Sequence, residues 1–292
     1  MPHGKFQVGD LTAIIGDNEA YGDHAAGYNG VHSLTHRSEA TSLFVPRYAG
    51  LNYEHIFDGE KDLRDLTFKR SDIFFEPRRA PMEYSKIADN EAELHQPPTP
   101  TFQLESWTRF KLVAPHYIDF TFRCKPTQHN FQNGYIGAFW ASYINGPDDK
   151  SIYFRHKERW QQLCTQRHND ESTVLHEKDG MKLKVMDNPP DTLYIHFSQL
   201  RFDEPFFYGN FKNHVFMMMF EPKPKIRFTH SPSGGGDNKE TQSSNPAWDW
   251  QFIVPEYDVM KEYSYRARAV YRERCSRAEI LKEYTNWRES LG

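Results

Sequence analysis

A carboxylate placed between two tryptophans is the pattern in this sequence with the clearest chemical use. The segment NPAWDWQF holds Asp249 between Trp248 and Trp250, with Gln251 following. In a strand, Asp249 and Gln251 face one side and the tryptophans the other. Aromatic neighbours desolvate a carboxylate and raise its pKa toward the range of a general base. We therefore expect Asp249 to be the catalytic base and Trp248 and Gln251 to bind substrate, unless both tryptophans belong to the core.

A histidine beside an arginine and a carboxylate is the second chemical candidate. The segment RWQQLCTQRHND brings Arg167, His168 and Asp170 together. An imidazole in such company can donate or accept a proton near neutral pH. We expect His168 to be the catalytic acid. The alternative is a solvated histidine in a loop.

Polar residues that could hold a ligand gather around residue 50. The segment VPRYAGLNYEH contains Arg47, Asn52 and His55 beside small residues that let a ligand approach. Earlier in the chain, His32 and His36 would face the same side of a strand about 13 Å apart, at roughly 3.3 Å per residue. Such a pair cannot share a metal ion without other ligands. The sequence therefore identifies no cofactor with certainty, and a divalent metal is one possible ligand of this region.

An arginine on a predicted strand is a further binding candidate. The segment LESWTRFKLV places Arg109 four residues after Glu105, on the same face of the strand. The two residues would form either a solvated ion pair or a clamp for a substrate. We include Arg109 among the expected substrate-binding residues.

An antiparallel sheet is the predicted framework for these side chains. In HYIDFTFRCKP the apolar residues Ile118, Phe120 and Phe122 alternate with polar ones, which is the period of a half-buried strand. The run YIGAFWASYIN is apolar on both faces, as in a central strand, and ends near Trp140 and Tyr143. We expect both aromatic residues to contact the substrate.

Further β-rich runs separated by turn residues continue this pattern. One hairpin is predicted with its turn at Asp89-Asn90, and another with its turn at Asp179-Gly180. Residues 61–80 are charged and end in prolines, which indicates a connection on the surface. The Gly- and Ser-rich segment 231–245 leads into Asp249, so we expect a mobile loop that covers the ligand site.

The C-terminal segment is the clearest helix. Ser276 and Glu279 form a capping box ahead of one apolar face. The fold class predicted from these patterns is all-β: a large antiparallel β-sandwich with a short C-terminal α-helix. We expect residues 1–275 to form the sandwich domain and residues 276–292 to form a helix that packs on it or on a partner chain in a homodimer.

The composition argues against several classes of partner. The 292 residues include 36 Lys and Arg against 40 Asp and Glu, and no basic stripe is present, so we expect no nucleic-acid partner. The longest apolar run, 215–220, is too short to span a membrane. No signal peptide is visible and the 3 cysteines lack metal-like spacing, so we expect a cytoplasmic protein. The aromatic excess of 22 Phe, 16 Tyr and 6 Trp suits walls that hold polar ligands.

These segments, in this order, resemble the galactose mutarotase-like superfamily of carbohydrate enzymes, which has a large β-supersandwich fold. PRYAGLN resembles the family's early Gly-Arg…Asn-Arg segment through Arg47 and Asn52. The paired runs FKLVAPHYIDFTFRCKP and GYIGAFWASYIN look like its central strands. The segment from Asp249 to Gln251, followed by a proline and EYSYRARAVY, is similar to its late acid-x-Gln strand and final strand. The resemblance covers residues 5–272.

Two departures from the family pattern bear on the chemistry. The family's central strand delivers a histidine that acts as general acid, whereas ASYINGP has none at that place. The resemblance therefore leaves the acid to another histidine, for which His168 is our candidate. In addition, Asp249 stands where the family has glutamate.

Three functions follow as hypotheses. The first is a carbohydrate-active enzyme that transfers protons on a sugar or sugar acid, as an epimerase, mutarotase or lyase. The second is a carbohydrate-binding protein without catalysis, and the third is a structural homo-oligomer. Loss of turnover with retained binding in Asp249→Asn would separate the first hypothesis from the second.

Overall fold

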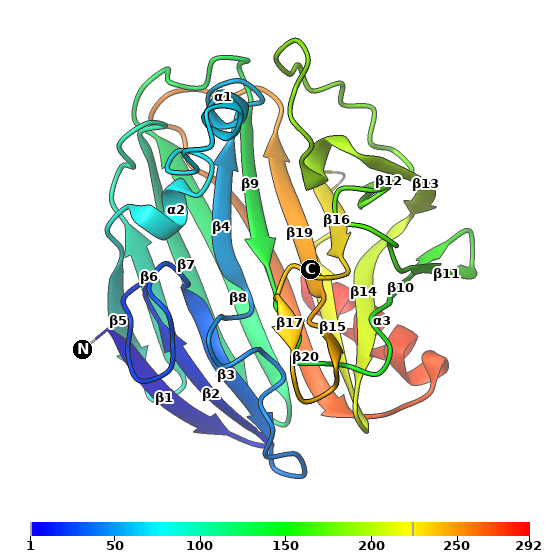
Figure 1. Ribbon diagram of the computed structural model, residues 1–292. Helices are drawn as coiled ribbons and strands as arrows, with labels where there is room; N and C mark the ends of the chain where they lie inside the picture. The colour runs from blue at the N-terminus through cyan, green and yellow to red at the C-terminus, as the bar shows by residue number, and fades with distance from the viewer. Residues whose placement is uncertain (1, 224) are drawn as a thin grey trace.

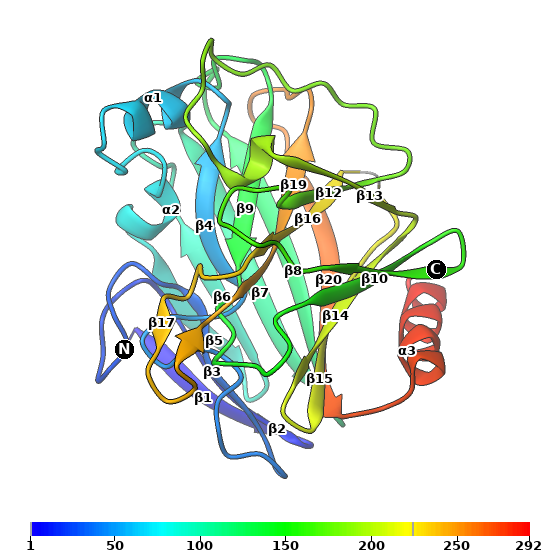
Figure 2. The same cartoon turned by 45° about the vertical axis from the view of Figure 1, so that its right-hand side comes forward.

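Two large sheets packed face to face form the body of the protein, as the sequence predicted (Figure 1). The computed structural model describes residues 2–223 and 225–292. Figure 2 shows the same arrangement from the side on which the C-terminal helix comes forward. The fold class is therefore an all-β sandwich with short helices outside it.

The larger sheet has nine antiparallel strands. In spatial order they are β11 (Arg159–Leu163), β10 (Ile152–His156), β14 (Glu204–Phe211), β15 (His214–Phe220), β20 (Tyr263–Glu273), β8 (Tyr117–Pro126), β7 (Leu104–Val113), β6 (Glu91–Gln96) and β5 (Glu83–Ala88). Burial along β8 alternates strictly, as expected from its period-2 sequence. The hairpin of β5 and β6 turns at Asp89-Asn90, which confirms that prediction.

The smaller sheet has six strands and carries the candidate site. Its spatial order is β13 (Phe197–Phe202), β12 (Thr173–His176), β16 (Ile226–Ser231), β19 (Ala247–Val254), β9 (Ile136–Ala141) and β4 (Asn52–Phe57). The pair β12 and β13 is parallel and the other neighbours are antiparallel. The N-terminal strands β1 (His3–Val8), β2 (Leu11–Gly16) and β3 (Gly30–His36) form a separate three-stranded sheet.

The main core lies between the two large sheets and is rich in aromatic rings. Trp140 on β9 and Trp250 on β19 are cross-strand partners whose rings stack at 5.6 Å. Phe120 of β8 packs edge-on against both indoles from the opposite sheet. Trp248 stacks on Phe216 of β15 and is also fully buried. Much of the aromatic excess in the sequence therefore fills this core.

The other face of the six-stranded sheet is covered by irregular chain and two short helices. The helices are α1 (Lys61–Thr67) and α2 (Glu76–Arg79), so residues 61–80 are more than the surface connection that we expected. The predicted hairpin at Asp179-Gly180 is wrong, because the chain from 177 to 192 has no strand and only a 3-10 turn (Leu193–Ile195) precedes β13. Asp179 instead pairs with the buried Arg227 of β16.

The C-terminal helix α3 (Arg277–Ser290) packs on the nine-stranded sheet of its own chain (Figure 2). Ser276 and Glu279 form the predicted capping box. The buried side chains of α3 are Ile280, Tyr284 and Trp287, and they meet β14 and β15. In residues 2–223 and 225–292, no helix combines the length and apolar character needed to cross a membrane.

Candidate functional site

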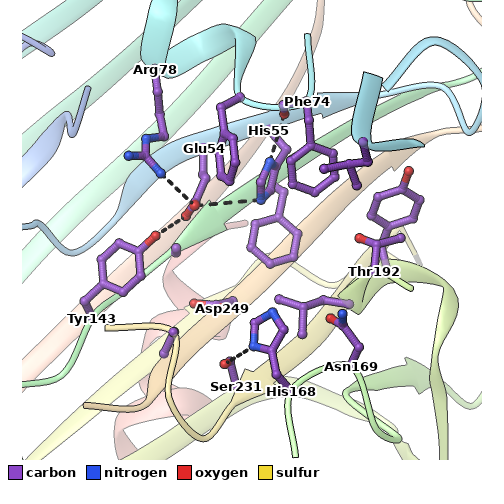
Figure 3. A pocket seen from close by; sticks show the side chains of 18 of the residues that line it. Glu54, His55, Phe74, Arg78, Tyr143, His168, Asn169, Thr192, Ser231 and Asp249 are labelled. Atoms are coloured by element: carbon purple, nitrogen blue, oxygen red, sulfur yellow. Dashed lines mark hydrogen bonds and ion pairs between the residues drawn. The ribbon is translucent and has the colours of Figure 1, made fainter. Parts of the chain in front are cut away.

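A cavity of about 380 Å³ opens on the outer face of the six-stranded sheet (Figure 3). Strands β4, β9 and β19 form its floor, and the segment containing α1 and α2 forms one wall. The loop before β12 and the residues after β16 close the other side. Its lining residues are Tyr28, Glu54, His55, Leu66, Phe74, Phe75, Arg78, Phe139, Ala141, Tyr143, His168, Asn169, Asp191, Thr192, Leu193, Tyr194, Ser231, Gly234, Ala247 and Asp249.

A β-bulge on β4 brings two consecutive polar residues into the cavity. Tyr53 pairs with Trp140, and His55 pairs with the adjacent residue of the antiparallel strand β9, Phe139. Glu54 has no partner on β9 and is therefore an extra residue on its strand. Consecutive residues of a regular strand face opposite sides, whereas a bulge re-aims one of them. Glu54 and His55 therefore both line the cavity, while Tyr53 stays in the core.

Glu54 is the best-connected carboxylate in the cavity. Tyr143 donates its hydroxyl to Oε2 at 2.6 Å, and Arg78 of α2 donates from Nη1 to Oε1 at 3.2 Å. The Arg78 guanidinium also lies over the Tyr28 ring and donates from Nε to the carbonyl of Gly27. Ion pairing and hydrogen bonding compensate the buried charge of Glu54.

His55 is neutral in this environment. Its Nδ1 lies 2.9 Å from the carbonyl oxygen of Phe74, which can only accept, so Nδ1 carries the hydrogen and Nε2 has the lone pair. Burial lowers the pKa of His55 to about 4, although the nearby Glu54 opposes that shift. The cavity thus presents Nε2 of His55 as a hydrogen-bond acceptor.

Asp249 is buried without a compensating cation. It is 1% exposed, and its Oδ1 accepts one hydrogen bond, from the backbone N–H of Ser142 at 3.1 Å. Burial raises the pKa of Asp249 well above its ordinary value, and the charge of Glu54 adds to the rise. Both effects favour the protonated form of this carboxyl group.

His168, in the loop between β11 and β12, lines the same cavity as Asp249, and Figure 3 shows the two side chains on the side opposite Glu54 and His55. Its Nδ1 is 2.8 Å from Oγ of Ser231, the last residue of β16. Partial desolvation lowers the pKa of His168 below 6.5, although Glu54 opposes the shift. The neutral imidazole is therefore favoured, so the cavity holds a carboxyl group with a raised pKa and an imidazole with a lowered pKa.

The structure brings four of the ten predicted site residues to this cavity: Asp249, His168, His55 and Tyr143. A fifth, Asn52, lies behind it, where its Nδ2 is 3.4 Å from Oε2 of Glu54. These positions agree with a shared site, and the catalytic and binding roles stay predictions. Ser231 and Gly234 also line the cavity, so the loop after β16 borders it as expected. The ordering of that loop on binding stays a prediction.

The other five predicted residues lie elsewhere. Trp140 and Trp248 are fully buried in the core between the sheets, because their alternation on β9 and β19 turns them away from the cavity. Gln251 shares the face of Asp249 but donates to Thr173 and Thr229 instead of lining the cavity. Two arginines complete the set. Arg47 is exposed on the chain before β4, and Arg109 pairs with Glu93 on the nine-stranded sheet.

Sequence reasoning missed Glu54, Arg78 and the apolar wall formed by Leu66, Phe74 and Phe75. Glu54 stands between two residues that we did select, but alternation places it on the face of Asn52 and opposite His55. The one available signal for Arg78 was an arginine pair after a proline in a charged segment. Neither pattern specifies a site without knowledge of the bulge and of α2.

Comparisons with solved structures identify the fold. No family model and no curated protein matches the sequence. A putative aldose 1-epimerase from Escherichia coli K12 is 8% identical with a TM-score of 0.52, covering 93% of this chain and 99% of that chain. A galactose mutarotase-like protein from Lactobacillus casei is 8% identical with a TM-score of 0.53, covering 92% and 100%. The chain has a galactose mutarotase-like fold.

A third match supports the same fold. A galactose mutarotase related enzyme from Lactobacillus acidophilus is 10% identical with a TM-score of 0.50, covering 93% of this chain and 97% of that one. At these identities the galactose mutarotase-like fold is shared, and the reaction must be argued from the cavity.

A metal centre has no support in this cavity. Within the described ranges, 2–223 and 225–292, no group of three or more His, Cys, Asp or Glu side chains is arranged to hold a metal ion.

Proposed function

We propose that this protein is an acid/base enzyme that interconverts the anomers of a sugar bound in the cavity. The observation that carries the proposal is that one cavity is lined by a buried carboxyl group with a raised pKa, Asp249, and by an imidazole with a lowered pKa, His168. Groups whose environments leave one with a proton and the other without are the usual acid and base of an active site. The proteins named as an aldose 1-epimerase and as galactose mutarotase-like, which share the fold, support a carbohydrate substrate.

In the proposed reaction, Asp249 donates its proton to the ring oxygen while His168 accepts the proton of the anomeric hydroxyl. The bond between the anomeric carbon and the ring oxygen breaks, and the electrons of the hydroxyl O–H bond form the aldehyde C=O. After rotation about the adjacent C–C bond, the ring closes by the reverse transfers. The charge states thus favour Asp249 as first donor and His168 as first acceptor, the reverse of the roles expected from sequence.

The remaining polar groups hold the substrate and maintain these charge states. The charge of Glu54 helps to keep Asp249 protonated, and Nε2 of His55 accepts from a sugar hydroxyl. Phe74, Phe75 and Phe139 supply apolar surface for the C–H faces of the sugar ring. The pocket therefore has both acceptors and flat walls, as a monosaccharide requires.

The test is anomer exchange, measured by polarimetry and NMR on a panel of pure aldose anomers. Asp249→Asn keeps the shape of the side chain and its acceptor for the Ser142 N–H, so it should fold and bind while losing about 10²- to 10⁴-fold in rate. Asp258→Asn, which changes an exposed carboxylate paired with Lys261, is the matched control.

Equal exchange rates in Asp249→Asn and wild type would refute the proposal. Binding of aldoses without faster exchange would replace it with the carbohydrate-binding hypothesis. Deuterium incorporated from solvent at a sugar carbon would instead assign proton transfer at carbon, as in epimerisation or elimination.

A further inference from the structure

The loop between β2 and β3, residues 17–29, holds the helix that carries Arg78. Near the start of the loop, Nδ2 of Asn18 donates to the carbonyl oxygen of Ala80, just after α2, at 2.8 Å. Near its end, the carbonyl oxygen of Gly27 accepts from Nε of Arg78 at 2.7 Å. Both ends of the 17–29 loop therefore fix the position of this arginine.

Through Arg78, the 17–29 loop affects the charge inside the cavity. Arg78 is the cation that pairs with the buried carboxylate of Glu54 (Figure 3). Its guanidinium also lies 3.8 Å from the centre of the ring of Tyr28, a residue of the same loop. Movement of the loop would take an acceptor and a packing surface away from Arg78. A buried carboxylate that loses its cation takes up a proton more readily.

Two stacked histidines hold the 17–29 loop closed. His24 lies in the loop and His32 lies on β3, and the centres of their rings are 3.6 Å apart. Nε2 of His32 is 3.1 Å from the carbonyl oxygen of Asp17, and Nε2 of His24 is 2.9 Å from that of Tyr28. A carbonyl oxygen only accepts, so each Nε2 carries a hydrogen. These two bonds fix the two ends of the loop, beside the residues that hold α2.

Neither imidazole has an acceptor for a second proton. Nδ1 of His24 and Nδ1 of His32 are buried and have no hydrogen-bond partner among the residues that the structure describes. Burial lowers the pKa of His24, although nearby backbone groups oppose the shift. Burial also lowers the pKa of His32, to about 3, and a charge on His24 would lower it further. The closed loop therefore favours two neutral rings.

The groups around the stacked pair do not stabilise a positive charge on it. His3 of β1 stacks on Tyr21, which packs against both imidazoles, and a charge on His3 opposes a charge on either of them. Asp17 accepts on Oδ1 from the backbone N–H of Glu19, and burial raises the pKa of its carboxyl group. The chain before β4 presents backbone groups to the pair. A proton on either ring therefore makes a buried cation without an anionic partner.

We propose that the 17–29 loop is a latch on the cavity that acid releases. While His24 and His32 are neutral, the loop holds Arg78 on Glu54. A proton on either imidazole is accommodated by opening the loop to water, and this opening frees α2. The latch goes beyond the proposed function, because it sets the charge of the cavity whatever reaction takes place there.

The first test follows the opening of the loop with pH. The pKa values of both histidines are lowered in the closed loop and return toward 6.5 in the open loop, so the closed form is lost as pH falls below 6.5. From pH 7 to pH 5 the open fraction should rise about twentyfold through His32 alone, and more if His24 also titrates.

Hydrogen–deuterium exchange, measured by mass spectrometry and divided by the intrinsic rate at each pH, reports this fraction in peptides covering 17–29 and 76–80. Both regions should exchange faster than β8, which reports global unfolding.

The second test asks whether the two rings are the trigger. Glutamine can donate an N–H to the same carbonyls and does not titrate in this range, so His24→Gln and His32→Gln should each reduce the rise in exchange. The double variant should abolish it. His129→Gln, at an exposed histidine, is the matched control and should keep the full rise. The two single variants decide the matter if the double variant does not fold.

The third test concerns the connection from the loop to α2. Asn18→Ala removes the donor to Ala80 and leaves both histidines, so residues 76–80 should exchange about threefold to tenfold faster at pH 7. Asn286→Ala, at an exposed position of α3, is its control. In wild type, the Nε–H signal of Arg78 in NMR spectra should lose protection from solvent exchange at pH 5, relative to free arginine at the same pH.

The inference is overturned if the corrected exchange of the loop is the same at pH 7 and pH 5, or is no faster than that of β8. It is also overturned if the rise persists in the histidine variants. A loop that opens in acid while α2 and Nε of Arg78 stay protected would show that it does not hold the arginine. These readouts use no sugar, so a lack of anomer exchange would refute the proposed function and leave the latch unaffected.

Discussion

The two faces of strand β19 differ in how completely their side chains are satisfied. On the inner face, Trp250 stacks on Trp140 and donates from Nε1 to the hydroxyl of Tyr265 at 2.6 Å. On the outer face, the preceding residue Asp249 is equally buried but has one backbone donor and no cation. Of these adjacent residues, Trp250 thus stabilises the core, whereas Asp249 is a buried carboxyl group without a cationic partner. Changes at the two positions should therefore have separable effects.

The largest expected effect is the loss of an inner-face ring. Trp250→Ala should lower the free energy of unfolding by about 3–5 kcal/mol, because it leaves a cavity in the core. Denaturant unfolding followed by circular dichroism measures the change, and Met260→Ala at the surface is the control. A loss under about 1 kcal/mol, which is typical of surface substitutions, would show that the inner face is less critical than the packing indicates.

The next effect concerns the chemistry of the outer face. His168→Gln should lower the rate of anomer exchange by about 10²-fold, the lower end for a general acid or base, with little change in stability. His156→Gln on β10 is a matched control outside the cavity. In wild type, the rate should also fall as the pH drops to His168's pKa, below 6.5, because protonated His168 cannot accept a proton. A rate that is flat through this range would contradict the assignment.

A smaller effect links the outer face to stability. The pKa of Asp249 is raised above 3.8 in the folded state, so the carboxyl group contributes stability at low pH that is lost as pH rises toward the folded pKa. Asparagine does not ionise, so the Asp249→Asn variant does not undergo this loss. The free energy of unfolding of the variant minus that of wild type should therefore increase as pH rises above 4, by at most about 1.4 kcal/mol per pH unit. A difference that stays constant with pH would mean that Asp249 ionises normally.

The smallest effect is a shift of the alkaline limb of the pH–rate profile. In the proposed reaction the rate falls at high pH, because ionised Asp249 has no proton to donate. Glu54 is one cause of the raised pKa of Asp249, so Glu54→Gln should lower that pKa and move this fall in rate to lower pH. Asp191→Asn, at another carboxylate that lines the cavity, should leave the limb in place. An unchanged limb in Glu54→Gln would mean that burial alone controls Asp249.

The sequence predicted what short-range pattern determines. The alternation in β8, the β5–β6 hairpin and the capping box of α3 each depend on neighbours within a few residues, and all three are present. The hairpin expected at Asp179-Gly180 failed because Asp179 forms a buried ion pair with Arg227, 48 residues later in the chain. A local pattern contains no information about that partner.

Asp249 and His168 were predictable as site residues, whereas Glu54 and Arg78 were not. Alternation correctly separates Asp249 from Trp248 and Trp250, and the chemical character of Asp249 and His168 can be read from composition. The sequence does not tell which of the two faces of β19 packs in the core, because both faces are buried. Arg78 reaches Glu54 because α2 folds over the sheet, and Glu54 enters the cavity through the bulge. Both facts depend on tertiary structure.

The bulge on β4 also makes the length of the strand a functional variable. The ladder with β9 uses Tyr53 and His55 and passes over Glu54. Deleting Glu54 would therefore restore regular pairing with Tyr53 still on Trp140 and His55 still on Phe139. Such a deletion would remove the carboxylate that Arg78 and Tyr143 hold, yet could be tolerated by the sheet. Single-residue insertions and deletions on this strand are thus a route by which a protein of this architecture can gain or lose an acidic group without disturbing its framework.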